Sequence, residues 1–154
     1  MVDSPTARLK QKNLVLPPPP KPAGTYAPVV VEKDRAWVSG QIVTDAGSVV
    51  SPGLVDRDVP FDQAKELARR ATLQALSALQ TTLGSIDRIS RVVRVGIYVA
   101  SSTGFVRQHD VGNGATELLV ELFDERGRPA RVSMGVASLP LNAPVEVELA
   151  VALG

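Results

Sequence analysis

The most regular hydrophobic pattern in the chain lies over Phe61–Leu83. Apolar residues recur there at spacings of three and four, which is the repeat of one helix face. Gly84 follows where a glycine commonly caps the end of a helix. The stripe is rich in alanine, so this helix can lie close to a flat partner such as a sheet. A second helix with an apolar face is predicted over 111–124.

Alternating apolar and polar residues predict strands in the rest of the chain. The alternation runs through 91–100, 131–137 and 145–151, and two short β-branched segments precede the first helix, at 29–31 and 36–38. The predicted order is strand, strand, helix, strand, helix, strand, strand. This order is typical of an α+β domain with a mixed sheet and two helices packed on one face.

Two helices can cover only one face of such a sheet, so the other face meets solvent or another subunit. Small and charged residues share strand sides that we assign to this face: Ser133, Gly135 and Ala137 on one strand, and Glu146, Glu148 and Ala150 on another. This mixture favours self-association of the protein over an open face.

The first 25 residues differ from the rest of the chain. Four consecutive prolines, Pro17 to Pro20, predict a rigid polyproline II segment. A short helix is predicted over 6–13, with Asp3 or Ser4 near its N-terminal cap. We interpret 1–25 as a Pro-rich arm packed on the surface of one domain, 26–154, in preference to a recognition ligand for another protein.

The overall composition is that of an ordinary globular protein with little net charge. The 154 residues are 44% hydrophobic and 21% charged, which fits a single domain. A net charge of +1 argues against a dedicated nucleic-acid-binding protein, since such proteins show a clustered basic excess. The absence of cysteine excludes disulfides, thiolate nucleophiles and thiolate metal sites. With no secretory signal and no apolar stretch of roughly 20 residues, we expect a cytoplasmic protein that does not contact membranes.

Several polar residues lack the surroundings that catalysis or metal binding requires. His109 is the single histidine, which supports neither a histidine metal site nor a triad, so we expect it on the surface at a helix start. The Gly112-Asn113-Gly114 segment lacks the spacing of a phosphate-binding loop. Asp56 and Asp58 open like a calcium loop, but a proline and a phenylalanine follow where its next ligand and turn glycine belong.

Arg131 and Glu146 are stronger candidates. Arg131 begins a predicted strand, where a planar guanidinium can bind a carboxylate through two parallel hydrogen bonds. Glu146 lies in the last strand between two valines, where it can accept from Arg131 or position a water. A structural ion pair across two strands explains both residues as well, and periodicity alone favours it. The residues by themselves therefore indicate a small α+β oligomer with an Arg–Glu pair of open purpose.

From about Tyr26 to Leu153 the chain resembles the RidA/YjgF family, whose members also carry the descriptions endoribonuclease L-PSP and translation inhibitor. The resemblance rests on Tyr26, Val38-Ser39-Gly40-Gln41, the helix at 64–83, Asn113, Pro129-Ala130-Arg131, Leu139-Pro140 and Val145-Glu146-Val147-Glu148. The interval from Arg131 to Glu146 matches that of the family. The Pro-rich arm and the segment 135–144 are similar to a longer-chain branch of it.

The resemblance implies a chorismate-mutase-like fold in a homotrimer whose sheets face inward, with ligand clefts between subunits. It implies hydrolysis of reactive enamine or imine intermediates, such as 2-aminoacrylate, to a 2-oxo acid and ammonia, with no metal or organic cofactor. The residue roles that it implies are these: Arg131 binds the carboxylate of a small metabolite, Glu146 orients the attacking water, Tyr26 walls the cleft or hydrogen-bonds the ligand, Ser39 and Gly40 shape its floor, and Asn113 is structural or lies at its edge. Ser133 belongs to the same substrate-binding set and stands where many members carry a cysteine, so thiol chemistry is excluded there.

Two other functions remain open at this point. A non-catalytic trimer that binds a small carboxylate in the same cleft needs Arg131 equally. An endoribonuclease or translation inhibitor is the least favoured, because three Phe, two Tyr and one Trp offer no stacking platform for bases, and near-neutral charge offers no basic groove.

Overall fold

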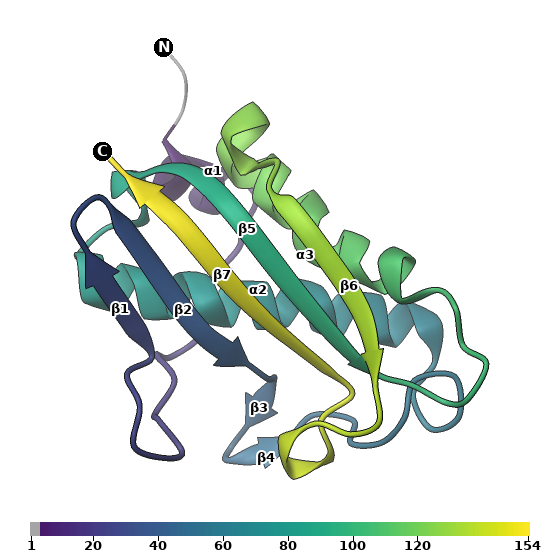
Figure 1. The fold of residues 1–154 in the computed structure, drawn as a ribbon. Coiled ribbons are helices and arrows are strands. Elements are labelled where there is room, and N and C mark those ends of the chain that lie inside the picture. The colour runs from purple at the N-terminus through teal and green to yellow at the C-terminus, as the bar shows by residue number, and fades with distance from the viewer. Residues whose placement is uncertain (1–3) are drawn as a thin grey trace.

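The computed structural model describes residues 4–154, which form one five-stranded sheet with helices on one side and a small separate two-stranded hairpin (Figure 1). Five strands lie in the order β1-β2-β7-β5-β6. Their bounds are Val29–Glu32 for β1, Arg35–Gln41 for β2, Ile89–Ala100 for β5, Ala130–Val136 for β6 and Val145–Leu153 for β7. All neighbours pair antiparallel except β5 and β6, which pair parallel, so the predicted mixed sheet is confirmed.

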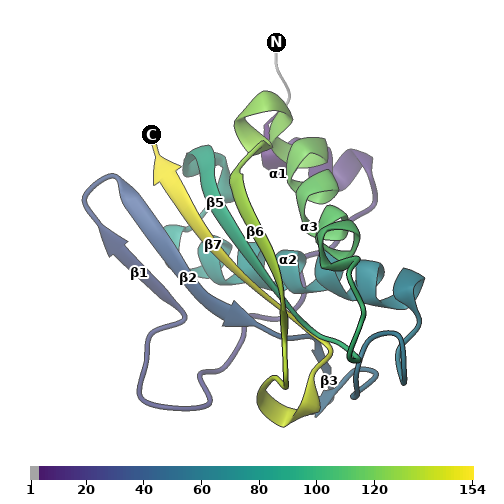
Figure 2. The ribbon, with the colours of Figure 1, turned by 45° about the vertical axis from the view of Figure 1, so that its right-hand side comes forward.

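Two long helices cover one face of this sheet, as predicted (Figure 2). Helix α2 spans Phe61–Leu83 and α3 spans Gln108–Phe123, a turn earlier at its start than expected. The alanines of α2 are buried against the sheet and α3. Gly114 of α3 lies so close to α2 that an added Cβ would stand 2.0 Å from the carbonyl oxygen of Lys65. The close approach of the two helices therefore depends on small side chains.

Strand β7 shows how the two faces of the sheet differ. Val145, Val147, Leu149 and Val151 are buried under the helices, whereas the residues between them are partly exposed on the other face. Three short 3-10 turns connect elements, Ile86–Arg88, Asp124–Gly127 and Pro140–Asn142, and a small hairpin joins β3 (Thr44–Asp45) to β4 (Ser48–Val49). Within residues 4–154 no helix combines the length and apolarity needed to cross a membrane.

The N-terminal arm packs on the helical side of the sheet. Helix α1 spans Pro5–Gln11 and is capped by the Ser4 hydroxyl, which accepts from the backbone N–H of Ala7; the alternative cap, Asp3, lies outside the described residues. Arg8 forms a two-pronged ion pair with Asp124, just beyond the end of α3. Farther along, the hydroxyl of Ser77 in α2 donates to the carbonyl of Pro17. The arm is thus fixed to both long helices.

The assignment of Ser133 and Gly135 to the uncovered face is wrong. Ser133 is opposite Ile97 in the parallel pairing and faces α3, where its Oγ lies against Gly112. Gly135 faces Gln108 of the same helix. The alternate residues Val132 and Met134 lie on the other face instead, and Met134 is 43% exposed. On this edge strand the apolar set is therefore the outward one, because α3 approaches the small residues closely.

Candidate functional site

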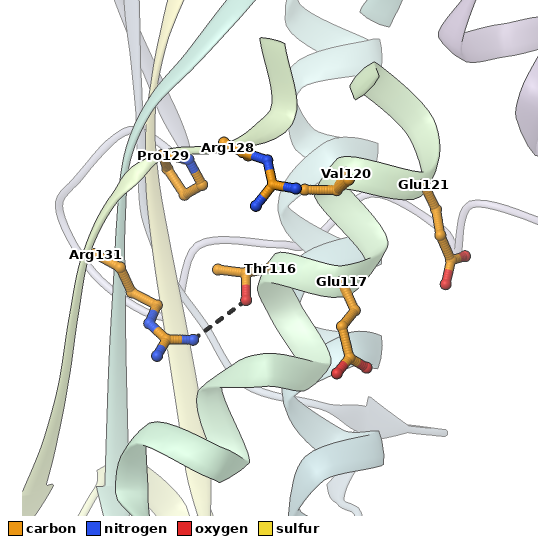
Figure 3. A pocket seen from close by; sticks show the side chains of 7 residues that line it. All are labelled: Thr116, Glu117, Val120, Glu121, Arg128, Pro129 and Arg131. Atoms are coloured by element: carbon orange, nitrogen blue, oxygen red, sulfur yellow. Dashed lines mark hydrogen bonds between the residues drawn. The ribbon is translucent and has the colours of Figure 1, made fainter. Parts of the chain in front are cut away.

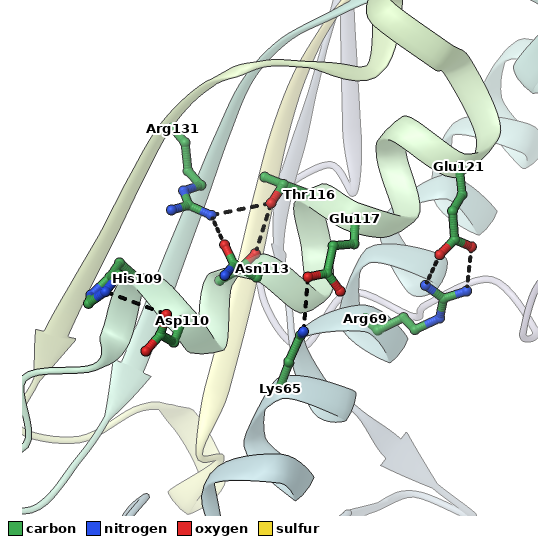
Figure 4. A network of polar contacts seen from close by, with 10 residues as sticks. Lys65, Arg69, His109, Asp110, Asn113, Thr116, Glu117, Glu121 and Arg131 are labelled. Atoms are coloured by element: carbon green, nitrogen blue, oxygen red, sulfur yellow. Dashed lines mark hydrogen bonds and ion pairs between the residues drawn. The ribbon is translucent and has the colours of Figure 1, made fainter.

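Arg131 lies at the start of β6 and reaches over the first half of α3 (Figure 4). Its Nη1 donates to Asn113 Oδ1 at 2.8 Å and to Thr116 Oγ1 at 3.2 Å. These acceptors are one helical turn apart, so they face the strand together. Both acceptors are neutral, and no carboxylate within residues 4–154 forms an ion pair with Arg131. The guanidinium is therefore oriented while its positive charge stays available to an anion.

A surface groove of about 640 Å³ lies beside this arginine (Figure 3). It runs between α3 and β6, with Val120 and Pro129 as apolar walls, and the other lining residues are Thr116, Glu117, Glu121, Arg128 and Arg131. Glu117 and Glu121 pair with Lys65 and Arg69 of α2 at 2.9 and 2.8 Å, so these two acids are neutralised from behind (Figure 4). The groove can therefore accept a small anion with an apolar part.

Glu146 lies near the start of β7, on the face of the sheet that the helices leave open. It is partly buried, and no hydrogen bond to its carboxylate forms within residues 4–154. Burial, and secondly the negative charge of Glu148, raise the pKa of Glu146 above the usual range of a glutamate. A carboxylate with a raised pKa and no bound donor is suited to accept a proton from water.

Ser39 and Gly40 shape the surroundings of Glu146. They occupy an irregularity in the pairing of β2 with β7. Gly40 lies so close to the glutamate that an added Cβ would stand 1.8 Å from Glu146 Oε1. Ser39 Oγ donates to the carbonyl of Ala27 at 2.7 Å, which fixes the chain next to Tyr26. Tyr26 is 50% exposed and its hydroxyl accepts from the N–H of Ala23.

The candidate residues thus form two groups within one chain. Arg131, Asn113 and Ser133 lie on the helical face at edge strand β6, whereas Glu146, Ser39 and Gly40 lie at the junction of β2 and β7, with the Glu146 carboxylate on the open face. Because β5 stands between β6 and β7, the expected ion pair of Arg131 with Glu146 does not form within a chain. One chain therefore holds an anion-binding group and a proton acceptor that face different ways.

Thr116 is a part of the Arg131 group that the sequence did not indicate. Its only signal is its position three residues after Asn113 on the same helix face. Ser133 also differs from expectation, because its Oγ is buried against Gly112 without a hydrogen-bond partner in the described chain. Its hydroxyl thus lies between β6 and α3, two residues along the strand from Arg131, and Ser133 does not line the groove.

Three residues for which the sequence predicted no catalytic or metal-binding role, His109, Asp56 and Asp58, contact neighbouring polar side chains. His109 is exposed in the first turn of α3, as predicted, with Nε2 3.5 Å from a carboxylate oxygen of Asp110. Asp58 accepts hydrogen bonds from Arg57, and Asp56 accepts one from Ser102, so both acids stabilise their loop.

Comparison with known proteins places the chain in a family. The family model described as Endoribonuclease L-PSP matches residues 18–153. The chain is 37% identical to "Protein TCP17" of Trypanosoma cruzi over 96% of its own length and 92% of that protein. It is 30% identical to the 2-iminobutanoate/2-iminopropanoate deaminase of Dermatophagoides farinae, over 84% and 86% of the two chains.

A solved structure described as a putative endoribonuclease from Shewanella oneidensis has the same fold. The two superpose with a TM-score of 0.93 at 27% identity, over 98% of this chain and all of the other. The match therefore includes most of the N-terminal arm, although the family model begins only at residue 18. Together with the nearly full-length family match, these likenesses show that the chain belongs to the endoribonuclease L-PSP family, the group also called RidA/YjgF.

Proposed function

We propose that the protein is a hydrolytic deaminase that converts small 2-imino acids, or the enamines in equilibrium with them, to 2-oxo acids and ammonia. The observation that carries this proposal is Arg131, whose charge is oriented by Asn113 and Thr116 and has no carboxylate partner among the described residues. An imino acid presents the carboxylate that such a guanidinium binds in bidentate fashion. The likeness to an imine deaminase of the same family supports the reaction type.

The complete site in this proposal is made by two chains. Since Arg131 and Glu146 face opposite sides of one sheet, one substrate can meet both only where a neighbouring chain supplies the second group. Met134 and Trp37 are exposed on the open face and Val132 is partly exposed there, which supports such contacts. We therefore propose a homotrimer with clefts between subunits, each cleft combining the Arg131 group of one chain with the Glu146 group of the next.

The reaction needs few chemical groups because the imine carbon is already electrophilic. Arg131 holds the carboxylate and so fixes the imine carbon next to a water bound at Glu146. Glu146 takes a proton from this water as its oxygen bonds to the carbon, and the C=N electron pair moves to nitrogen. Glu146 passes this proton to the nitrogen to give a carbinolamine. The carbinolamine hydroxyl then gives its proton through Glu146 to the same nitrogen, so that the C–N bond breaks, ammonia leaves and the C=O bond of the 2-oxo acid forms. The balance is imine plus water to ketone plus ammonia, and positioning supplies most of the rate gain.

The test is release of 2-oxo acid when an amino-acid oxidase generates imines in the presence of the protein. We expect acceleration by the wild type and a loss of about 100-fold in kcat/KM for Arg131→Ala, since truncating one partner of a charge pair costs roughly 2–5 kcal/mol. Arg128→Ala is the matched control, because Arg128 lines the same groove but is paired with Glu125. Light scattering establishes whether each variant keeps the assembly of the wild type.

The outcomes separate the alternatives. Equal losses of kcat/KM in Arg131→Ala and Arg128→Ala would contradict the proposal that Arg131 binds the substrate carboxylate. No acceleration by the wild type with several imines, together with binding of 2-oxo acids that Arg131→Ala abolishes, would replace the enzyme with a metabolite-binding protein that uses the same groove.

A further inference from the structure

A second glutamate on the open face, Glu148, accepts hydrogen bonds from two neighbouring side chains. Glu148 Oε1 accepts from Arg94 Nη1 at 2.8 Å and from the Tyr98 hydroxyl at 3.0 Å. Both donors come from β5, and neither is needed for the function proposed above. The Glu148 carboxylate also packs directly against the backbone of Gly96, where an added Cβ would stand 2.7 Å from Glu148 Oε1.

Glu146 and Glu148 are arranged alike but bonded differently. Two residues apart on one strand, they point to the same face at a Cα separation of roughly 7 Å. Each lies over a glycine of a neighbouring strand, Gly40 of β2 and Gly96 of β5 respectively. Tyr98 is opposite Glu146 in the pairing of β5 with β7, yet its hydroxyl bonds to Glu148. The Glu148 carboxylate is thus fixed by two donors, whereas no hydrogen bond to Glu146 forms within residues 4–154.

We propose that Glu148 is a positioning residue for Glu146: anchored by Arg94 and Tyr98, it holds a negative charge beside Glu146 and thereby makes Glu146 the better proton acceptor. This inference rests on the proposed function. The two strands next to β7 bring no other acid or base near Glu146, since Ser39 and Gly40 of β2 are uncharged, Tyr98 is neutral and Arg94 is bound to Glu148. Arg131 of the same chain faces the other side of the sheet.

The electrostatics of the cluster agree with this geometry. Besides burial, the charge of Glu148 raises the pKa of Glu146. Burial, and then the hydrogen bond to Glu148, raise the pKa of the Tyr98 hydroxyl, so Tyr98 stays protonated and continues to donate. Two carboxyls with different surroundings therefore divide the work: Glu148 is held by two donors, and Glu146 gains affinity for a proton.

A merely structural role for Glu148, in tying β5 to β7, is the competing explanation. Two conservative variants separate the two roles. Glu148→Gln and Arg94→Gln both break the ion pair, but only the first removes the negative charge next to Glu146. If Glu148 has only a structural role, the titration midpoint of Glu146 changes in the same way in both variants. If the charge of Glu148 acts on Glu146, the two changes differ in sign or size.

The experiment is a titration of the Glu146 side chain by NMR of protein labelled with ¹³C at the glutamate carboxyl carbon, with the signal assigned by its loss in Glu146→Gln. In Glu148→Gln we expect the midpoint of Glu146 to move to lower pH than in the wild type. In Arg94→Gln the charge of Glu148 remains, so we expect no movement to lower pH. The acid limb of the kcat/KM profile for imine hydrolysis should move with the NMR midpoint in each variant.

The results distinguish this inference from the proposed function. An unchanged midpoint in Glu148→Gln, or the same downward movement in both variants, overturns the role of Glu148. A moved NMR midpoint in a protein that does not accelerate imine hydrolysis refutes the deaminase, and the inference about catalysis falls with it, while the coupling of the two carboxylates is established. Movement of both readouts in Glu148→Gln alone supports the inference.

Discussion

Replacing Gly40 with alanine tests whether the placement of Glu146 depends on a missing side chain. An added Cβ would stand 1.8 Å from Glu146 Oε1 and 2.7 Å from its Cδ. Ordinary contact begins near 3.4 Å, so the carboxylate oxygen would have to withdraw by about 1.6 Å. The side chain can do so because it is only partly buried.

The expected stability change is small, whereas the expected change in activity is large. The backbone at Gly40 does not have a positive φ, so alanine fits it and reduces the freedom of the unfolded chain, a gain of about 0.4–1 kcal/mol. Forcing Glu146 off its preferred rotamer costs about 0.5–1.5 kcal/mol, which roughly cancels that gain. A displacement of more than 1 Å of a group that positions the attacking water lowers kcat/KM by about 100-fold.

The assay combines urea unfolding with imine hydrolysis in a double-mutant cycle. Gly40→Ala is measured in the wild type and again in a Glu146→Ala background, where there is no carboxylate to displace. We expect the loss of activity to vanish in that background. The same loss in both backgrounds, or a destabilisation of several kcal/mol, would refute the reasoning, because the alanine would then act on the backbone instead of on Glu146.

The remaining predictions concern the packing of the helices and the titration of Glu146. Gly114→Ala should lower the free energy of unfolding by about 3 kcal/mol in urea, since its Cβ would stand 2.0 Å from the Lys65 carbonyl oxygen and the two helices would have to separate; a change below 0.5 kcal/mol would contradict the close approach. Glu146→Gln should raise stability at neutral pH and not at acidic pH: a carboxyl whose pKa is raised on folding favours the folded state below its unfolded pKa, and this stability is lost as pH rises through the folded pKa. Urea unfolding of both proteins at several pH values checks it, and a difference independent of pH would contradict it.

The helices and the strand order could be predicted because their patterns are long. Helix α2 agrees with its predicted bounds, since its apolar repeat continues over 23 residues and ends at a glycine, Gly84, in the left-handed conformation. The start of α3 at Gln108 was missed because its first turn is polar and has no capping side chain. Periodicity thus indicates the part of a helix that packs and gives little information about an exposed first turn.

The faces of β6 could not be predicted from alternation. The rule that apolar residues face the core fails here, because Val132 and Met134 point to the open side of the sheet while Arg131 and Ser133 point to α3. An edge strand with a helix lying close along one side and exposed surface on the other has no face that must be apolar. For the same reason the sequence did not predict that Arg131 and Glu146 lie apart. Only the pairing register of β6 shows that the two side chains face opposite sides of the sheet.

The place of β7 in the sheet bears on how the chain folds. This strand comes last in the sequence but lies in the middle, and the pair β1-β2 is joined to the pair β5-β6 only through it. The core under the helices therefore closes through contacts between residues far apart in sequence, which is the kind of topology that slows folding. During synthesis the earlier strands and both long helices leave the ribosome before their central partner exists. The sheet, and with it the strand that carries Glu146, is assembled only after the final residues of β7 have been added.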